Sequence, residues 1–147
     1  MDDAAPFFVG GVVHEHRGIV LNSNGDELMC FFEDPFEGAR AASVLLDRLG
    51  DWNRAENALP SPFRVRCGYH VGDCLLDRER GVAYSEVVDI AGHLQKAAEP
   101  DGLLISADAL RGLPPGLPFE GVGKKGKNGL EAYRLSGPIP STAPTLG

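Results

Sequence analysis

The chain has 147 residues, 43% of them hydrophobic, and its 14 basic and 21 acidic side chains give a net charge of −7. This length suits one domain with a single core. The acidic balance, without a long basic stretch, argues against a nucleic-acid-binding surface. No apolar run approaches the length that crosses a bilayer, so we expect no membrane span.

Three cysteines, Cys30, Cys67 and Cys74, lie inside apolar segments. Their odd number and the absence of a C-x-x-C spacing favour reduced core thiols over disulfides or a zinc site. The sequence opens with two acidic residues, Asp2 and Asp3, where a secretory signal needs positive charge. Together these patterns predict a cytoplasmic protein.

The first half of the chain predicts a hairpin followed by a helix. Residues 7–16 leave helix and strand open, because their valines suit a strand and their spacing also fits a helix. Apolar runs on both sides of a Gly-Asp corner predict strands at 18–23 and 27–33. Asp34 can cap a helix that has a proline at its first position. Its apolar face is formed by Phe36, Ala39, Ala42, Leu45, Leu46 and Leu49. Residues 50–62 predict a loop.

The second half predicts short strands that alternate with helices. We expect strands at 63–69, 74–76, 103–105 and 131–135. Ser85 and Ser106 can each cap a helix, the first reaching about residue 98 and the second stopping at Gly112. Residues 136–147 are rich in Pro, Ser, Thr and Gly and predict a flexible tail, which leaves 1–135 as the domain.

This order of elements predicts a fold class. Hairpins that alternate with single helices suit a mixed α/β sheet with helices packed on one face, which is the ferredoxin-like type of sandwich. The sequence shows no internal repeat.

Four segments in this order resemble the catalytic domain of class III nucleotidyl cyclases, the enzymes that make cyclic AMP or cyclic GMP. They are the hairpin Gly18–Phe32, the strand pair Phe63–Leu75 (FRVRCGYHVGDCL), the helix-turn-strand Tyr84–Ser106 (YSEVVDIAGHLQKAAEPDGLLIS) and the closing segment Phe119–Leu135. The third segment is the most specific, since it matches at nearly every apolar and turn position. The four cover most of residues 12–135.

The resemblance implies a mechanism for the family. Two carboxylates from neighbouring strands hold two divalent ions, Mg²⁺ or Mn²⁺. The ribose 3′-oxygen attacks the α-phosphorus of a nucleoside triphosphate and pyrophosphate leaves. An Asn and an Arg on a helix of the opposing subunit orient the ribose and stabilise the transition state. The implied partner is therefore a second copy of this chain or another cyclase-type domain.

The metal site departs from the family pattern. Asp26, at the tip of the first hairpin, matches the second metal carboxylate. The first carboxylate is expected on a strand well before the hairpin, and Asp2 and Asp3 lack its context. A single carboxylate is seldom enough for a divalent ion, so we expect metal binding through Asp26 to be weak or absent.

The nucleotide-binding positions depart as well. The resemblance puts Asp89 where the family has Asn, and His93 where it has Arg. A carboxylate repels a triphosphate, and a neutral imidazole poorly replaces a permanent bidentate cation. The purine-reading Lys falls at Asn22 and its acidic partner near Val82. Lys125, or its neighbour Lys124, corresponds to the triphosphate lysine.

Three hypotheses follow. The first is a degenerate cyclase-homology domain, a pseudoenzyme that serves signal transduction by binding a nucleotide or a partner. The second is an active adenylate cyclase completed by an upstream segment or a partner chain. The third is a ferredoxin-like module without cyclase ancestry, in which His93 is a helix residue facing solvent or an interface. We favour the first, because four functional groups are absent or altered.

By the resemblance, the family's first strand, which carries the first metal carboxylate, is missing before the hairpin. Its absence raises a packing problem, because backbone groups of the neighbouring strands would be left unpaired inside the sheet. Residues 6–13 could form a substitute strand, another subunit could donate one, or the sheet could close up. We expect an obligate dimer, with the apolar stretch Pro6–Val13 as its contact surface.

Overall fold

The structure is a computed structural model that describes residues 11–24, 27–55, 64–72, 75–77, 79, 82–84, 86–125 and 129–140. After a helical turn at 11–15, the elements are β1 (Ile19–Asn24), β2 (Glu27–Phe31), α2 (Pro35–Ala55), β3 (Arg66–Tyr69), β4 (Leu75–Asp77), β5 (Val82–Tyr84), α3 (Glu86–Ala97), β6 (Gly102–Ser106), α4 (Ala107–Arg111), β7 (Phe119–Lys125) and β8 (Leu130–Leu135). Among the described residues, no helix combines the length and apolar character needed to span a bilayer.

The main sheet has four strands in the order β3-β6-β8-β7. β3 runs parallel to β6, while β8 runs antiparallel to both β6 and β7, so the sheet is mixed. The mixed α/β fold expected from the sequence is therefore confirmed.

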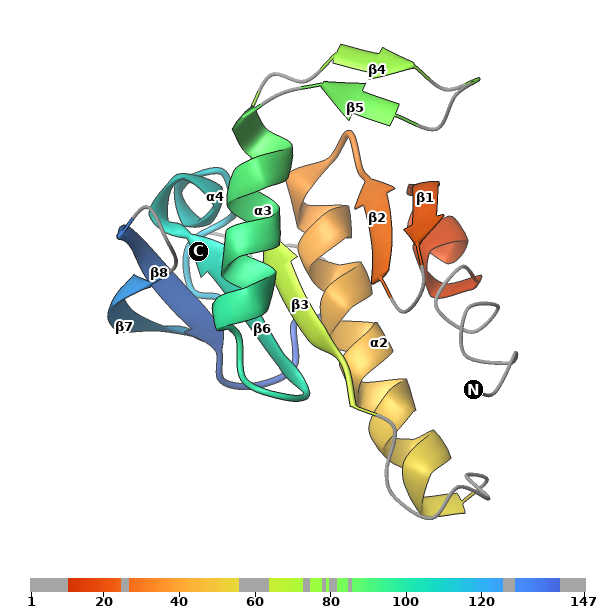
Figure 1. Cartoon of the computed structure of the whole chain (residues 1–147). Coiled ribbons are helices and arrows are strands. Elements are labelled where there is room, and N and C mark those ends of the chain that lie inside the picture. Colours follow the sequence, from red (N-terminus) through yellow and green to blue (C-terminus); the bar gives the residue numbers. More distant parts are fainter. Residues whose placement is uncertain are drawn as a thin grey trace.

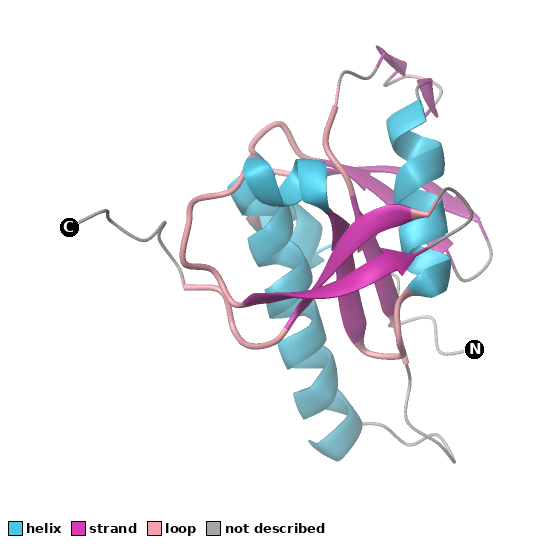
Figure 2. Cartoon of the chain, turned by 90° about the vertical axis from the view of Figure 1, so that its left-hand side faces the viewer, coloured by secondary structure: helices cyan, strands magenta, loops and turns pink. Residues whose placement is uncertain are grey.

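Helices cover both faces of this sheet, whereas the sequence predicted helices on one face (Figure 2). The reason lies in β6, where Leu103, Leu104 and Ile105 are all buried. Leu103 and Ile105 join the core cluster that contains residues of α2 and α4, and Leu104 joins the one that contains Leu94 of α3. Successive side chains of a strand point to opposite faces, so an uninterrupted apolar run needs a cover on each side.

Gly68 lets α3 lie directly on β3. A Cβ atom at Gly68 would be 2.2 Å from the backbone nitrogen of Gln95 and 2.3 Å from the carbonyl oxygen of Ala91. Both atoms belong to the helix backbone, which a side chain at this position would displace. The glycine therefore fixes the spacing between α3 and the sheet.

Two hairpins stand apart from the main sheet. β1 pairs with β2, β4 pairs with β5, and in the described part of the chain neither pair joins the four-stranded sheet. In Figure 1 the β1–β2 hairpin lies beyond the outer edge of β3, and β4–β5 lies beyond the N-terminal end of α3. Among the described strands, the sheet therefore has a break between β2 and β3.

The helical turn at 11–15 settles the conformation that the sequence left open. Val12 is 2% exposed and packs in a cluster with Ala41 and Leu45 of α2. His16 Nδ1 donates to the carbonyl oxygen of Val12 at 2.8 Å, and His16 Nε2 accepts from Arg40 Nη1 at 3.1 Å. The turn is therefore docked on α2, and residues 11–13 do not form the substitute strand.

Several boundaries differ from the sequence prediction. α2 continues through residues 50–55, which we expected in a loop. β5 and β7 were not expected as strands. Within the predicted tail, Ile139 is 6% exposed, and its backbone N–H donates to Ser43 Oγ at 3.2 Å. Residues 141–147 lie outside the described part.

Candidate functional site

Asp89 and His93 lie on α3, one turn apart, so they share one face of the helix. α3 forms because Ile90, Leu94 and the following Ala98 present an apolar stripe to the sheet. Asp89 is exposed and His93 is half-buried. The Nδ1 atom of His93 is enclosed and has no hydrogen-bond partner among the described residues.

This pair has the wrong charges for a polyphosphate. Asp89 contributes a carboxylate to the surface where the resemblance expects an amide. At most one ring nitrogen of His93 is accessible to a phosphate oxygen, since its Nδ1 is enclosed. A guanidinium instead presents several donors in a fixed plane that matches phosphate oxygens.

Lys125 and Lys124 lie at the end of β7 and both are exposed. Lys125 is opposite Leu130, which packs in the core cluster under α3, so Lys125 lies on the α3 face of the sheet. Lys124 is opposite Glu131 and lies on the other face. Of the two predicted alternatives, only Lys125 therefore shares a face with α3.

The metal ligand expected from the sequence, Asp26, lies outside the described residues. The neighbouring Asn22 is in β1 opposite Met29, just after an irregularity in the register, and Val82 pairs with Asp77 in the separate β4–β5 hairpin. The described residues contain no group of three or more His, Cys, Asp and Glu side chains that could hold a metal ion. The donor set of a two-metal site is thus not found in this part of the chain.

The α3 residues and the β1–β2 hairpin are not brought together. Figure 1 shows α3 across β3 and β6, with the hairpin beyond the edge of β3 that has no strand partner among the described residues. Within the described part of one chain, Asp89 and His93 are therefore separated from the hairpin by β3.

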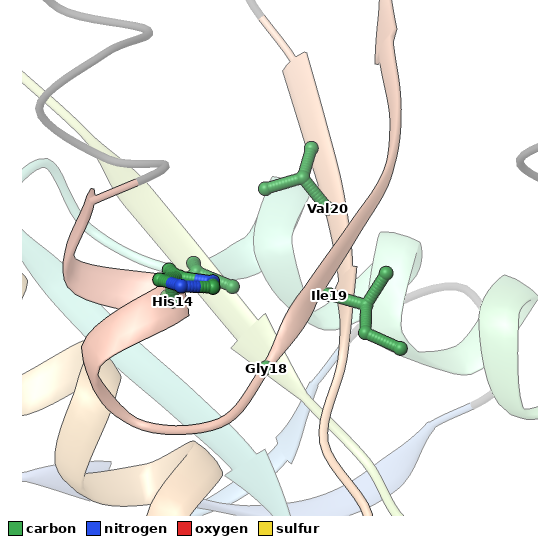
Figure 3. A pocket seen from close by; sticks show the side chains of 5 residues that line it. His14, Gly18, Ile19 and Val20 are labelled. Atoms are coloured by element: carbon green, nitrogen blue, oxygen red, sulfur yellow. The ribbon is translucent and has the colours of Figure 1, made fainter.

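Two hollows lie beside the hairpin, and the sequence did not predict them. The first, of about 310 Å³, is lined by Val13, His14, Gly18, Ile19 and Val20 and is mainly apolar (Figure 3). The second, of about 320 Å³, is lined in part by Glu33, Asp34, Glu37 and Arg17. Three carboxylates against one guanidinium make the second hollow unfavourable for a phosphate group.

No protein-family model matches the sequence, and no curated protein matches it. Solved structures do match. The adenylyl cyclase CyaB from P. aeruginosa has a TM-score of 0.80 at 16% identity, covering 96% of this chain and 83% of that chain. An adenylate/guanylate cyclase/hydrolase from Silicibacter pomeroyi has a TM-score of 0.75 at 17% identity, covering 91% and 79%. A Trypanosoma brucei adenylate cyclase, analysed in its monomeric state, has a TM-score of 0.74 at 18% identity, covering 94% and 77%.

The fold is that of a nucleotidyl cyclase catalytic domain. The resemblance seen in the four sequence segments is thereby confirmed at the level of the fold, over about nine tenths of the chain.

The cyclase-type sheet contains one polar contact that sequence reasoning did not assign. His70, after β3, shares a hydrogen bond between its Nδ1 and Ser106 Oγ, and the same oxygen accepts from the N–H of Ala109 at the start of α4. Burial lowers the pKa of His70, against an opposing effect of Glu86. The contact joins the ends of β3 and β6.

The two described cysteines are structural. Cys30 and Cys67 are free thiols, and burial raises the pKa of Cys30 to about 11 and that of Cys67 to about 12. Thiols with such pKa values are almost wholly protonated near neutral pH and therefore weak nucleophiles.

Proposed function

We propose that this chain is a degenerate cyclase-homology domain that binds a nucleotide or a second cyclase-type domain in signalling, without turnover. The observation that carries the proposal is the pair on α3. An exposed carboxylate and a half-buried imidazole occupy the positions where the resemblance expects an amide and a guanidinium.

The expected loss of rate is large. Removing one preorganised donor that stabilises developing charge typically costs about a hundredfold to a thousandfold in rate. Here both positions on α3 are altered, and the resemblance puts Asn22 at the position of the purine-reading lysine. Losses at several such positions bring catalysis below detection.

The second candidate is an active adenylate cyclase that converts ATP to cyclic AMP and pyrophosphate. It is favoured by the separation of the hairpin from α3, because a site shared between two chains could draw its missing groups from a partner. In that arrangement this chain supplies Asp26, with Mg²⁺ or Mn²⁺, and Lys125. The dimer and the cytoplasmic location remain predictions.

A thermal-shift titration with ATP and GTP, with and without Mn²⁺, tests nucleotide binding. A retained pocket raises the melting temperature progressively with ligand concentration, because only the folded state binds. Inorganic pyrophosphate serves as a control for binding through charge alone. If the melting temperature did not change with the concentration of any nucleotide, nucleotide binding would be excluded and partner binding would remain as the proposed function.

A restoration experiment tests degeneracy directly. We expect no cyclic nucleotide from the unaltered chain, and measurable product only when Asp89→Asn and His93→Arg are combined and a cyclase-type domain with an intact metal site is added. Lys96→Arg, on the same helix and also exposed, is the matched control. Sustained cyclic AMP production by the unaltered chain that Asp26→Ala abolishes would replace this proposal with the active enzyme.

A further inference from the structure

The second hollow beside the hairpin combines two kinds of wall that the proposed function does not use. Its volume is about 320 Å³, and small-molecule sites typically measure about 300–1,000 Å³. Side chains from the segment before β1, from the end of β2 and from the first turn of α2 line it. The hollow is therefore large enough for a small organic molecule.

One wall of this hollow is hydrophobic and tightly packed. Ile19, Phe31 and Phe32 form it. A Cβ atom at Gly18 would be 2.3 Å from Cε2 of the Phe32 ring, and a Cβ atom at Gly38 would be 3.2 Å from Cδ1 of the same ring. The two glycines thus leave the space that the ring fills and hold it in place. The faces of aromatic rings attract organic cations.

The remaining lining is mainly acidic. Glu33, Asp34 and Glu37 contribute three carboxylates against the single guanidinium of Arg17. The N-terminus of a helix adds only about half a positive charge, so the hollow keeps an excess of negative charge. Among the described residues, no three His, Cys, Asp or Glu side chains form a group that could hold a metal ion. The carboxylates border the hollow without converging on one point, which suits a bulky cation better than a metal ion.

Glu37 is the carboxylate best placed to receive such a cation. It is half-buried in the first turn of α2, and its side chain has no hydrogen bond or ion pair with the residues that the structure describes. Arg40, three residues later, donates to His16 Nε2 at 3.1 Å instead. Asp34 already accepts a backbone N–H, and Glu33 takes part in another interaction. A partly buried carboxylate without a partner is unfavourable, and a cation beside it would offset that cost.

We propose that this hollow binds an organic ammonium ion, with the charged nitrogen beside Glu37 and the hydrocarbon part against Phe31 and Phe32. An anion would be repelled by the carboxylates, and an uncharged molecule would leave Glu37 without a partner. The proposal does not depend on the proposed function, because none of the residues that line the hollow is at a position that the resemblance assigns to metal, nucleotide or catalysis.

A titration followed by two-dimensional NMR tests the site, with benzylammonium as the probe. This ion carries an aromatic ring and an ammonium group that is charged at neutral pH. Saturable shifts should appear at the backbone amides of residues 16–19 and 31–37, and added salt should weaken binding because it screens the charges. Benzyl alcohol has nearly the same shape without the charge, and we expect it to bind about tenfold more weakly.

Two variants change the charge of the hollow in opposite directions. Glu37→Gln keeps the size of the side chain and should raise the Kd for benzylammonium about threefold, whereas Arg17→Gln should lower it by a similar factor. Glu99→Gln, an equal change of charge at an exposed residue after α3, is the matched control and should leave the Kd unchanged.

Several results would overturn the proposal. They are shifts that do not saturate, shifts centred on another acidic surface, equal binding of benzyl alcohol, and an unchanged Kd in Glu37→Gln or Arg17→Gln. The comparison with benzyl alcohol uses the unaltered chain, so it decides the question even if a variant fails to fold.

Discussion

The two sides of β3 differ in how they are held. On one side β3 pairs with β6, and α3 lies so close that Gly68 has no room for a side chain. On the other side β3 has no described strand partner, and the β1–β2 hairpin is supported by α2 and the helical turn. In the described part of the chain, α3 is thus in direct contact with the main sheet, whereas the β1–β2 hairpin does not pair with it.

The largest expected effect is in the α3 side of the molecule. Leu94 is 1% exposed in the cluster between α3 and the sheet. We expect Leu94→Ala to lower the free energy of unfolding by about 2–5 kcal/mol, through lost apolar burial and a cavity. Val20→Ala is the control in the hairpin, because Val20 is 39% exposed; it should change stability by less than about 0.5 kcal/mol. Urea denaturation measures the free energy of unfolding of both variants. Similar losses for Leu94→Ala and Val20→Ala would contradict the difference between the α3 side and the hairpin.

The second prediction concerns the contact between α3 and β3. Gly68→Ala should destabilise the domain by about 1–3 kcal/mol, because the added methyl group meets helix backbone rather than a movable side chain. Gly92→Ala is the matched control on α3 itself, since nothing lies within 4 Å of the position of its Cβ atom. It should stabilise the helix by about 0.5–1 kcal/mol. The prediction requires Gly68→Ala to lower the melting temperature and Gly92→Ala to raise it.

The third prediction concerns the cap of α4. Ser106 is 2% exposed, and its hydroxyl oxygen accepts from the N–H of Ala109 at 3.1 Å. Ser106→Ala should cost about 1–2 kcal/mol in thermal or urea unfolding, because the cap is lost and His70 loses its partner. Ser106→Thr keeps a hydroxyl and should retain most of the stability. If Ser106→Ala were as stable as the unaltered chain, the stabilising role of the Ser106 cap would be contradicted.

The smallest effect is a pH dependence at the same contact. The pKa of His70 is lowered in the folded state from its ordinary value of 6.5, chiefly by burial. Below pH 6.5 the unfolded chain therefore binds more protons, so stability rises with pH up to about 6.5 and is lost as the pH falls through the folded-state pKa. His70→Gln should flatten this part of the profile of melting temperature against pH. An unchanged slope would show that other groups titrate there.

Local signals predicted most of the fold. Asp34 accepts a hydrogen bond from the N–H of Phe36 at 2.9 Å, as its position before a proline suggested, and Ser106 caps α4. β7 was missed because Gly121 and Gly123 interrupt its apolar pattern, and Gly123 has a φ of 82° at an irregularity in the register. The second helical layer could have been inferred from Leu103–Ile105, where no polar residue breaks the apolar run.

The site was less predictable than the fold. Spacing alone put Asp89 and His93 on one face of a helix, and the structure has them there. Spacing could not reveal that the Nδ1 atom of His93 is enclosed, or that Lys125 rather than Lys124 lies on the α3 face, because both depend on tertiary packing and strand register. Asp26 lies outside the described residues, so its role stays a prediction.

The hydrogen bond between Ile139 and Ser43 joins positions that are 96 residues apart. A ribosome releases Ser43 long before Ile139, so the part of α2 that Ile139 contacts stays uncovered until residue 139 has emerged. The last described segment therefore packs against α2 late in synthesis. Premature termination between residues 135 and 139 would leave all the described helices and strands, but the part of α2 that Ile139 contacts would be exposed.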